Sequence, residues 1–190
     1  MKIVSLLGSP RKKGNSAILA GIVTDTLAEN GSEVTTHALN ELSFRGCQAC
    51  GGCKAKSEVC VLKDDLTPVL NDIHEADVVV LSTPVYWGDI SSQMKGFIDR
   101  TYSFLTPGFM TEEKKHRLPP GKKLVFIQTQ GAPTEMYNDI FQRYNSFFEQ
   151  LSIFKESYLI HGGDINEKGA VKDRQDLLDK ARETAKSVMN

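Results

Sequence analysis

Three short apolar runs constrain the fold of this chain more than any other feature. They fall at residues 3–7, 77–82 and 122–129, and each has the length of a strand. A strand with apolar residues at successive positions is buried on both faces, which is typical of parallel sheets covered by helices. Further strands are predicted at residues 33–39 and 154–160. Helical periodicity alternates with the strands, at residues 16–29, 65–75, 91–102, 135–151 and 172–189.

This alternation predicts an α/β fold, a flavodoxin-like three-layer sandwich around a five-stranded parallel sheet. Residues 33–39 alternate between apolar and polar, as edge strands do, which favours the strand order 2-1-3-4-5. We expect residues 1–190 to form a single domain, with a cysteine-containing loop, residues 46–62, inserted after the second strand. Ligands of such sheets bind beyond the carboxyl ends of the strands, so the loops that follow the strands form the candidate site.

The charge and hydropathy of the chain exclude two classes of partner. The formal net charge is −1 with 25% charged residues, so no global field attracts nucleic acid or an anionic membrane. No apolar run reaches the roughly 18 residues that a membrane-spanning helix needs. The apolar stretch over residues 1–8 is too short for a signal peptide and is interpreted as the first strand. We therefore expect a cytoplasmic protein.

The loop after the first strand, residues 8–16, has the features of an anion site. It leads into a helix, whose first N–H groups and positive dipole end attract anions. Ser9, Asn15 and Ser16 add hydrogen-bond donors, and Arg11 adds a planar cation. The loop has neither the Walker A nor the G-x-G-x-x-G pattern, which disfavours nucleoside triphosphates and the usual dinucleotide fingerprint. The alternative is a polar loop in which Asn15 or Ser16 is an ordinary N-cap.

Two further loops at predicted strand ends suit a flat ligand. The loop after the third strand contains Pro84, Val85, Tyr86, Trp87 and Gly88. Its aromatic side chains and backbone donors fit a flavin ring, and the alternative is that the aromatic side chains pack against a helix or a partner subunit. The loop after the fourth strand is expected to reach the other side of the same ring with Thr129, Gln130 and Gly131.

All four cysteines lie within one short segment. Cys47, Cys50, Cys53 and Cys60 have the spacing C-x2-C-x2-C-x6-C, and neighbouring glycines give the backbone freedom to wrap around a cluster. This spacing resembles compact [4Fe–4S] ligation. Three alternatives stay open: a zinc site, a disulfide or redox-active thiol, and cysteines that only pack the loop.

Four stretches together resemble the NAD(P)H-dependent FMN reductase family, and within it the iron–sulfur flavoprotein branch: GSPRKKGNS, CQACGGC, STPVYWGDISSQMKGFIDR and TQGAP. The resemblance implies FMN as the cofactor and NAD(P)H as the cosubstrate. It also implies that Ser9, Arg11, Asn15 and Ser16 contact the phosphate of FMN and that residues 84–88 contact its ring. For the branch, it implies a cluster that exchanges electrons with FMN.

Two functions are compatible with these features. The first is an enzyme that uses NAD(P)H to reduce FMN, quinones or other small acceptors. The alternative is an electron carrier in which a cluster accepts electrons from ferredoxin and passes them to FMN. No catalytic acid or base is assigned, because the flavin carries the redox chemistry and the four histidines have no motif around them.

An aromatic series with helical spacing indicates how the chain packs. Tyr137, Phe141, Tyr144 and Phe148 follow each other at intervals of three or four residues. Such a stripe is typical of a core or of a subunit interface, and neighbouring apolar residues widen it beyond what one contact needs. We therefore expect a homodimer or homotetramer.

Overall fold

The computed structural model describes residues 1–190 and is built around one six-stranded sheet. Five strands are parallel and lie in the order β2-β1-β3-β5-β6. Their bounds are Lys2–Leu7 (β1), Glu33–Ala38 (β2), Val78–Tyr86 (β3), Lys123–Thr129 (β5) and Glu156–Gly162 (β6). The sixth strand, β4 (Asp89–Ile90), pairs antiparallel with the end of β3. The parallel strands thus follow one another as expected, and β4 is an additional strand that the sequence did not predict.

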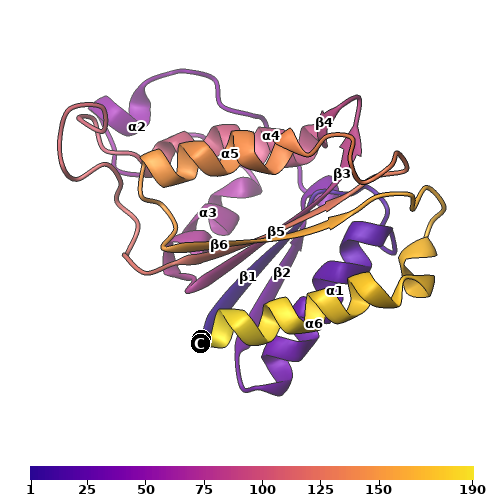
Figure 1. Cartoon of the computed structure of the whole chain (residues 1–190). Coiled ribbons are helices and arrows are strands. Elements are labelled where there is room, and N and C mark those ends of the chain that lie inside the picture. Colours follow the sequence, from indigo (N-terminus) through magenta and orange to yellow (C-terminus); the bar gives the residue numbers. More distant parts are fainter.

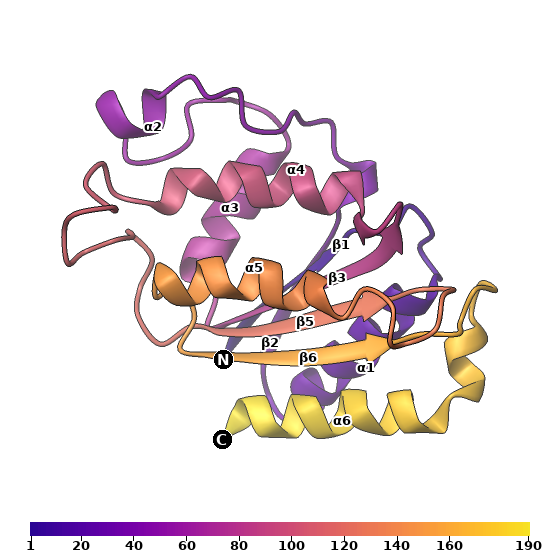
Figure 2. The same cartoon turned by 45° about the horizontal axis from the view of Figure 1, so that its top comes forward.

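Helices cover both faces of this sheet, which gives three layers (Figure 1). On one face lie α1 (Asn15–Glu29) and α6 (Gln175–Met189), which pack side by side. On the other face lie α3 (Leu66–Glu75), α4 (Ser92–Arg100) and α5 (Asp139–Gln150), as Figure 2 shows from a second direction. One-turn helices complete the chain: η1 (Leu39–Glu41), α2 (Gly52–Ala55), η2 (Thr101–Phe104) and η3 (Ala170–Asp173).

The central strand β3 has apolar side chains on both faces, so the sheet needs helices on both sides. Val78 and Val80 belong to the core cluster under α1 and α6, whereas Val79 and Leu81 belong to the cluster under α3, α4 and α5. All four side chains are almost completely buried. Because side chains alternate across a strand, a continuous run of Val and Leu fills both cores at once, as the sequence predicted.

One prediction about α5 is wrong. The aromatic series begins at Tyr137, but the helix begins only at Asp139, and Tyr137 itself has a φ of 61°. The side chain of Gln128 donates to the carbonyl oxygen of Tyr137 (3.0 Å) and so holds this residue in a turn. Phe141 packs on Phe126 of β5, and Phe148 packs on Phe154, so these members of the series contribute to the core.

The residue after β1, Gly8, contacts both β3 and the residue after β4. The backbone N–H of Gly8 donates to Ser82 O (2.8 Å), and the hydroxyl of Ser91 donates to Gly8 O (2.7 Å). A Cβ atom at Gly8 would lie 2.9 Å from Ser91 Oγ, so only glycine allows this approach. The same Ser91 hydroxyl accepts from Met94 N and caps α4. No helix in the structure is both long enough and apolar enough to span a bilayer.

Candidate functional site

A polar cavity of about 190 Å³ lies where the loops after β1, β3, β5 and β6 meet. This position is the carboxyl edge of the parallel strands, as expected for the ligand site of such a sheet. The cavity contains most of the predicted phosphate and ring residues and adds several from the last loop. Its lining consists of Ser9, Arg11, Gly14, Asn15, Ser16, Pro84, Val85, Tyr86, Thr129, Gln130, Gly131, Ile165, Asn166 and Lys168.

The start of α1 is open toward this cavity. No side chain caps the helix at its N-cap residue, Gly14, so the first N–H groups keep their donors free. The hydroxyl of Ser16 lines the cavity, is buried and has no hydrogen-bond partner. A buried hydroxyl without a partner is costly. An oxyanion at this helix terminus would satisfy it together with the free N–H groups.

The electrostatics of the cavity also favour an anion. Arg11 and Lys168 line it, no Asp or Glu does, and neither cation takes part in an ion pair. Ser9 accepts a hydrogen bond from the backbone N–H of Arg11 (3.1 Å), which folds this loop back toward α1. Lys168 and Asn166 were missed by the sequence prediction, because they follow β6 without any recognisable motif.

The side chain of Asn15 is hydrogen-bonded within the protein. Its side-chain amide donates to the carbonyl oxygens of Ile165 (2.7 Å) and Glu167 (3.0 Å). Its side-chain oxygen accepts from the backbone N–H of Val171 (3.2 Å). Both donors are used within the protein, so the side chain has none left for an anion. Asn15 instead ties α1 to the loop between β6 and η3.

The predicted ring loop after β3 is a β-hairpin. Pro84, Val85 and Tyr86 extend β3 and line the cavity, while Trp87 and Gly88 form the two-residue turn to β4. Both turn residues have positive φ, 51° and 77°, which is the signature of a type I′ hairpin. This conformation points Trp87 into solvent, where it is fully exposed. Only the first three of these five predicted residues therefore contact the cavity.

The loop after β5 is held by a small polar network. Gln130 donates from its amide to Pro133 O (2.8 Å) and Met136 O (2.6 Å), while its side-chain oxygen lies 3.0 Å from Nε2 of His161. Burial lowers the pKa of His161, which favours the neutral form of the ring. His161 thus supports a loop of the cavity without lining it.

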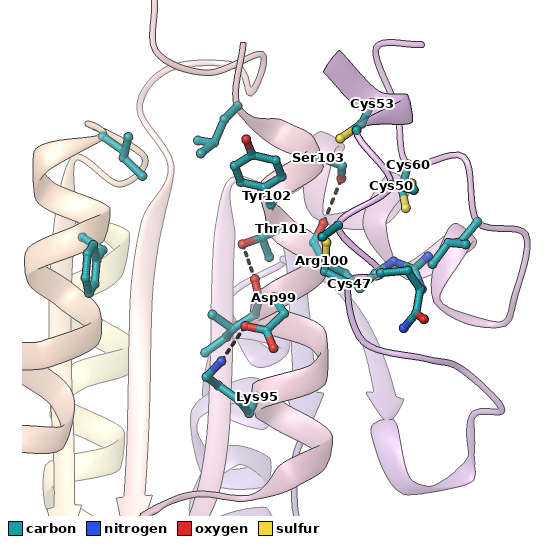
Figure 3. Close-up of a pocket in the computed structure, with 18 of the residues that line it drawn as sticks. Cys47, Cys50, Cys53, Cys60, Lys95, Asp99, Arg100, Thr101, Tyr102 and Ser103 are labelled. Carbon is teal, nitrogen blue, oxygen red and sulfur yellow. Dashed lines mark hydrogen bonds and ion pairs between the residues drawn. The ribbon is translucent and has the colours of Figure 1, made fainter. Parts of the chain in front are cut away.

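A second and larger cavity, of about 680 Å³, lies at the opposite end of α4. All four cysteines line it, together with apolar residues of α4 and α5. Figure 3 shows Cys53 on α2 and Cys47 lower down beside Arg100. All four thiols are free. No three His, Cys, Asp or Glu side chains lie close enough to hold a metal ion, so the cysteines share one cavity without converging on a point.

Three cations surround the cysteine segment. Arg100 forms an ion pair with Asp64, and Arg117 donates a hydrogen bond to the carbonyl oxygen of Cys53 (3.2 Å). The ammonium of Lys54 lies 3.7 Å from Sγ of Cys53 and donates to Tyr102 O and Leu105 O. Burial lowers the pKa of Lys54.

Sequence comparison decides the family. The family model of the NADPH-dependent FMN reductases matches residues 1–150. The chain belongs to this family. The match covers strands β1 to β5, the loops that follow β1, β3 and β5 and all four cysteines, and it ends before β6. It confirms the resemblance predicted from the sequence.

Iron–sulfur flavoproteins are among the relatives of this FMN reductase family member. An iron–sulfur flavoprotein of Archaeoglobus fulgidus is 40% identical over 100 residues, which is 53% of this chain and 45% of that protein. An iron–sulfur flavoprotein of Methanosarcina thermophila is 31% identical over 114 residues, 60% of this chain and 59% of that protein. The matched part thus spans about half the length of these relatives.

Solved structures share the fold of this FMN reductase family member. An NAD(P)H:quinone oxidoreductase from Methanothermobacter marburgensis superposes with a TM-score of 0.73 at 20% identity, covering 100% of this chain and 98% of that one. An FMN-dependent NADH-azoreductase from Bacillus anthracis, in complex with FMN, gives a TM-score of 0.74 at 14% identity, with both chains covered completely.

Proposed function

We propose that the protein is an FMN-dependent oxidoreductase that uses NAD(P)H to reduce FMN, quinones or other small acceptors. One observation carries this proposal: the cavity at the strand ends combines an uncapped helix start, a buried hydroxyl without a partner and two unpaired cations. This combination fits a phosphoryl group, which is the anionic end of FMN. Membership of the FMN reductase family supports the same assignment.

Each part of the cavity has a distinct task in this proposal. The start of α1, Ser16 and Arg11 bind the phosphate, while Pro84, Val85 and Tyr86 bound the ring. Cofactor sites usually enclose about 300–1,000 Å³, more than the 190 Å³ of this cavity. We therefore infer that the cavity takes the phosphate end and that the ring lies at the open rim, within reach of a nicotinamide. Once bound, the flavin supplies the redox chemistry.

Spectroscopy tests this function directly. We expect the fluorescence of FMN to be quenched when FMN is added to the flavin-free protein. The end point should lie at one FMN per chain. Anaerobic addition of NADPH or NADH to the FMN-loaded protein should bleach the flavin absorption, and a quinone should restore it. Protein that binds no FMN at any concentration, or bound FMN that neither nucleotide reduces, would contradict the proposal.

A second candidate function is that of an iron–sulfur flavoprotein that accepts electrons from ferredoxin. Four free thiols line one cavity and are surrounded by Lys54, Arg100 and Arg117. Thiolate ligation and nearby positive charge suit an anionic [4Fe–4S] cluster. Because the thiols do not converge, binding would require the loop over residues 46–62 to close around the cluster.

Anaerobic purification separates the cluster from its alternatives. A [4Fe–4S] cluster predicts about four irons and four sulfides per chain, lost when Cys50 and Cys60 are replaced by serine. One zinc per chain would indicate a zinc site instead. Metal-free protein with four titratable thiols would leave the cysteines as structural residues, and the reductase function would stand without them.

We further propose that the protein is a homodimer or homotetramer. Phe147 is 63% exposed and Tyr102 is 41% exposed, and both border the larger cavity. Apolar side chains grouped in this way are typical of association surfaces. Light scattering coupled to gel filtration should give two or four times the 21.1 kDa mass of the chain, and a monomer at micromolar concentration would exclude this proposal.

A further inference from the structure

We propose that Lys168 is a second cationic ligand of the FMN phosphate and that Asn15 is the residue that positions it. The inference rests on the proposed binding of FMN and deepens it. It assigns a binding role to the loop after β6, residues 163–169, which lies outside the part of the chain that the family model covers.

The charge of the ligand requires more than one cation. A phosphate monoester carries a charge of about −1.5 to −2 at neutral pH, and Arg11 supplies a single positive charge. Lys168 lines the same cavity, where no carboxylate competes for its ammonium group. It has no ion-pair partner elsewhere in the protein. Together the two cations match a phosphate dianion.

The loop that carries Lys168 is held in place on two sides. On one side it bonds to the loop after β5, since Asp164 N donates to Ala132 O (2.9 Å) and Ile165 N donates to Gln130 O (3.2 Å). Asn166 also packs closely against Gly131, where a Cβ atom would lie only 2.8 Å from its Oδ1. This side fixes the loop against the predicted ring-binding residues.

On the other side, Asn15 is the only side chain of α1 that forms hydrogen bonds with the loop and with η3. Its three hydrogen bonds, to Ile165 O, Glu167 O and Val171 N, bracket Lys168 in sequence. Because Asn15 is the first residue of α1, it joins Lys168 to the helix start that binds the same phosphate. Asn15 therefore acts through Lys168 and is a positioning residue.

The test compares FMN with riboflavin, which has the same ring but no phosphate, as ligands of the flavin-free full-length protein. For Lys168→Ala we expect the FMN dissociation constant to rise at least about tenfold, the scale of a lost charged hydrogen bond, with riboflavin binding unchanged. Lys168→Arg should restore most of the FMN affinity. Lys172→Ala removes the same charge from a nearby exposed position outside the cavity and should change neither constant.

A double-mutant cycle tests the role of Asn15. Asn15→Ala should weaken FMN binding in the wild-type background but have little further effect when Lys168 is already alanine. Equal weakening in both backgrounds would overturn the positioning role. Unchanged FMN affinity in Lys168→Ala would overturn the whole inference. Wild-type protein that binds no FMN would instead refute the proposed function, so the two failures are distinguishable.

Discussion

Arg100 and Asp64 form a bidentate ion pair, with Nη1 2.7 Å from Oδ2 and Nη2 3.1 Å from Oδ1. The Arg100 side chain is completely buried at the end of α4. The same Nη1 donates to the carbonyl oxygen of Arg45 (2.8 Å). Since Arg45 and Asp64 flank the cysteine loop over residues 46–62, one guanidinium holds both ends of that loop.

Breaking this pair should destabilise the protein strongly. Asp64→Asn leaves a buried cation without its counter-ion, so we expect the free energy of unfolding to fall by about 3 kcal/mol or more. Urea denaturation measures the loss. The matched control is Asp99→Asn, which removes the exposed pair between Lys95 and Asp99 and should cost less than about 1 kcal/mol. Similar losses in both variants would mean that the buried pair has no special role.

The same pair should add an acid-dependent component to stability. Burial opposes ionisation of Asp64, but hydrogen bonds from Arg100 and Arg45 outweigh it and lower the pKa below the ordinary 3.8. The folded state therefore binds the proton less readily than the unfolded state. The stabilisation is present above the ordinary pKa and disappears as the pH falls through the lower folded value. In Asp64→Asn, unfolding measured between pH 5 and pH 2 should show a shallower decline.

His161 should make stability depend on pH in a higher range. Burial lowers its pKa from 6.5, so the unfolded chain takes up a proton before the folded protein does. The free energy of unfolding should decrease as the pH falls below about 6.5 and level off below the folded pKa. His161→Gln should flatten the curve between pH 7.5 and pH 5. An unchanged slope in that variant would assign the pH dependence to other groups.

Ser16→Ala should have opposite effects on the free and the FMN-bound protein. In the free protein the substitution removes a buried hydroxyl that has no partner, so stability should stay constant or rise slightly. With FMN, the variant lacks one donor to the phosphate, and the dissociation constant should rise about 3- to 10-fold. Thermal unfolding with and without FMN measures both effects in one experiment. A stability loss in the free protein would mean that the hydroxyl has a partner after all.

Tyr144 connects α5 to the hairpin beside the cavity. Its hydroxyl donates to Asp89 Oδ1 (3.0 Å), and burial, followed by this contact, raises the pKa of Tyr144. Tyr144→Phe keeps the ring but loses the hydrogen bond, so we expect a loss of about 1 kcal/mol in the free energy of unfolding. Amide exchange at Ile90, in the short strand β4, should accelerate as well. No change at Ile90 would show that the hairpin is held without Tyr144.

The sheet and the first binding loop were predictable because their signals are local. The Val and Leu residues of β3 predicted a strand that is buried on both faces. The helix expected from residue 16 begins one residue earlier, at Asn15. The role of Asn15 was not predictable, since its partners lie about 150 residues away in the chain. Lys168 was missed for a related reason: only the folded chain brings the loop after β6 to the start of α1.

The β3–β4 hairpin was missed because its residues resemble a loop. Pro84 and Gly88 are common in turns, yet Pro84 lies near the end of β3, opposite Thr129, and Gly88 provides the second positive φ of the turn. The four cysteines, whose spacing suggested metal ligands, line one cavity. Spacing alone carries no information on how far apart the folded backbone holds them.

Trp87 is the only tryptophan of the chain, and it lies at the tip of the hairpin. Its fluorescence can therefore report on events at this position. Its emission arises from a single, solvent-facing indole next to the proposed ring site. A flavin arriving there should dim it by energy transfer, whereas a partner subunit covering the tip should shift it to shorter wavelength. Cofactor loading and subunit association can thus be followed separately in the unlabelled protein.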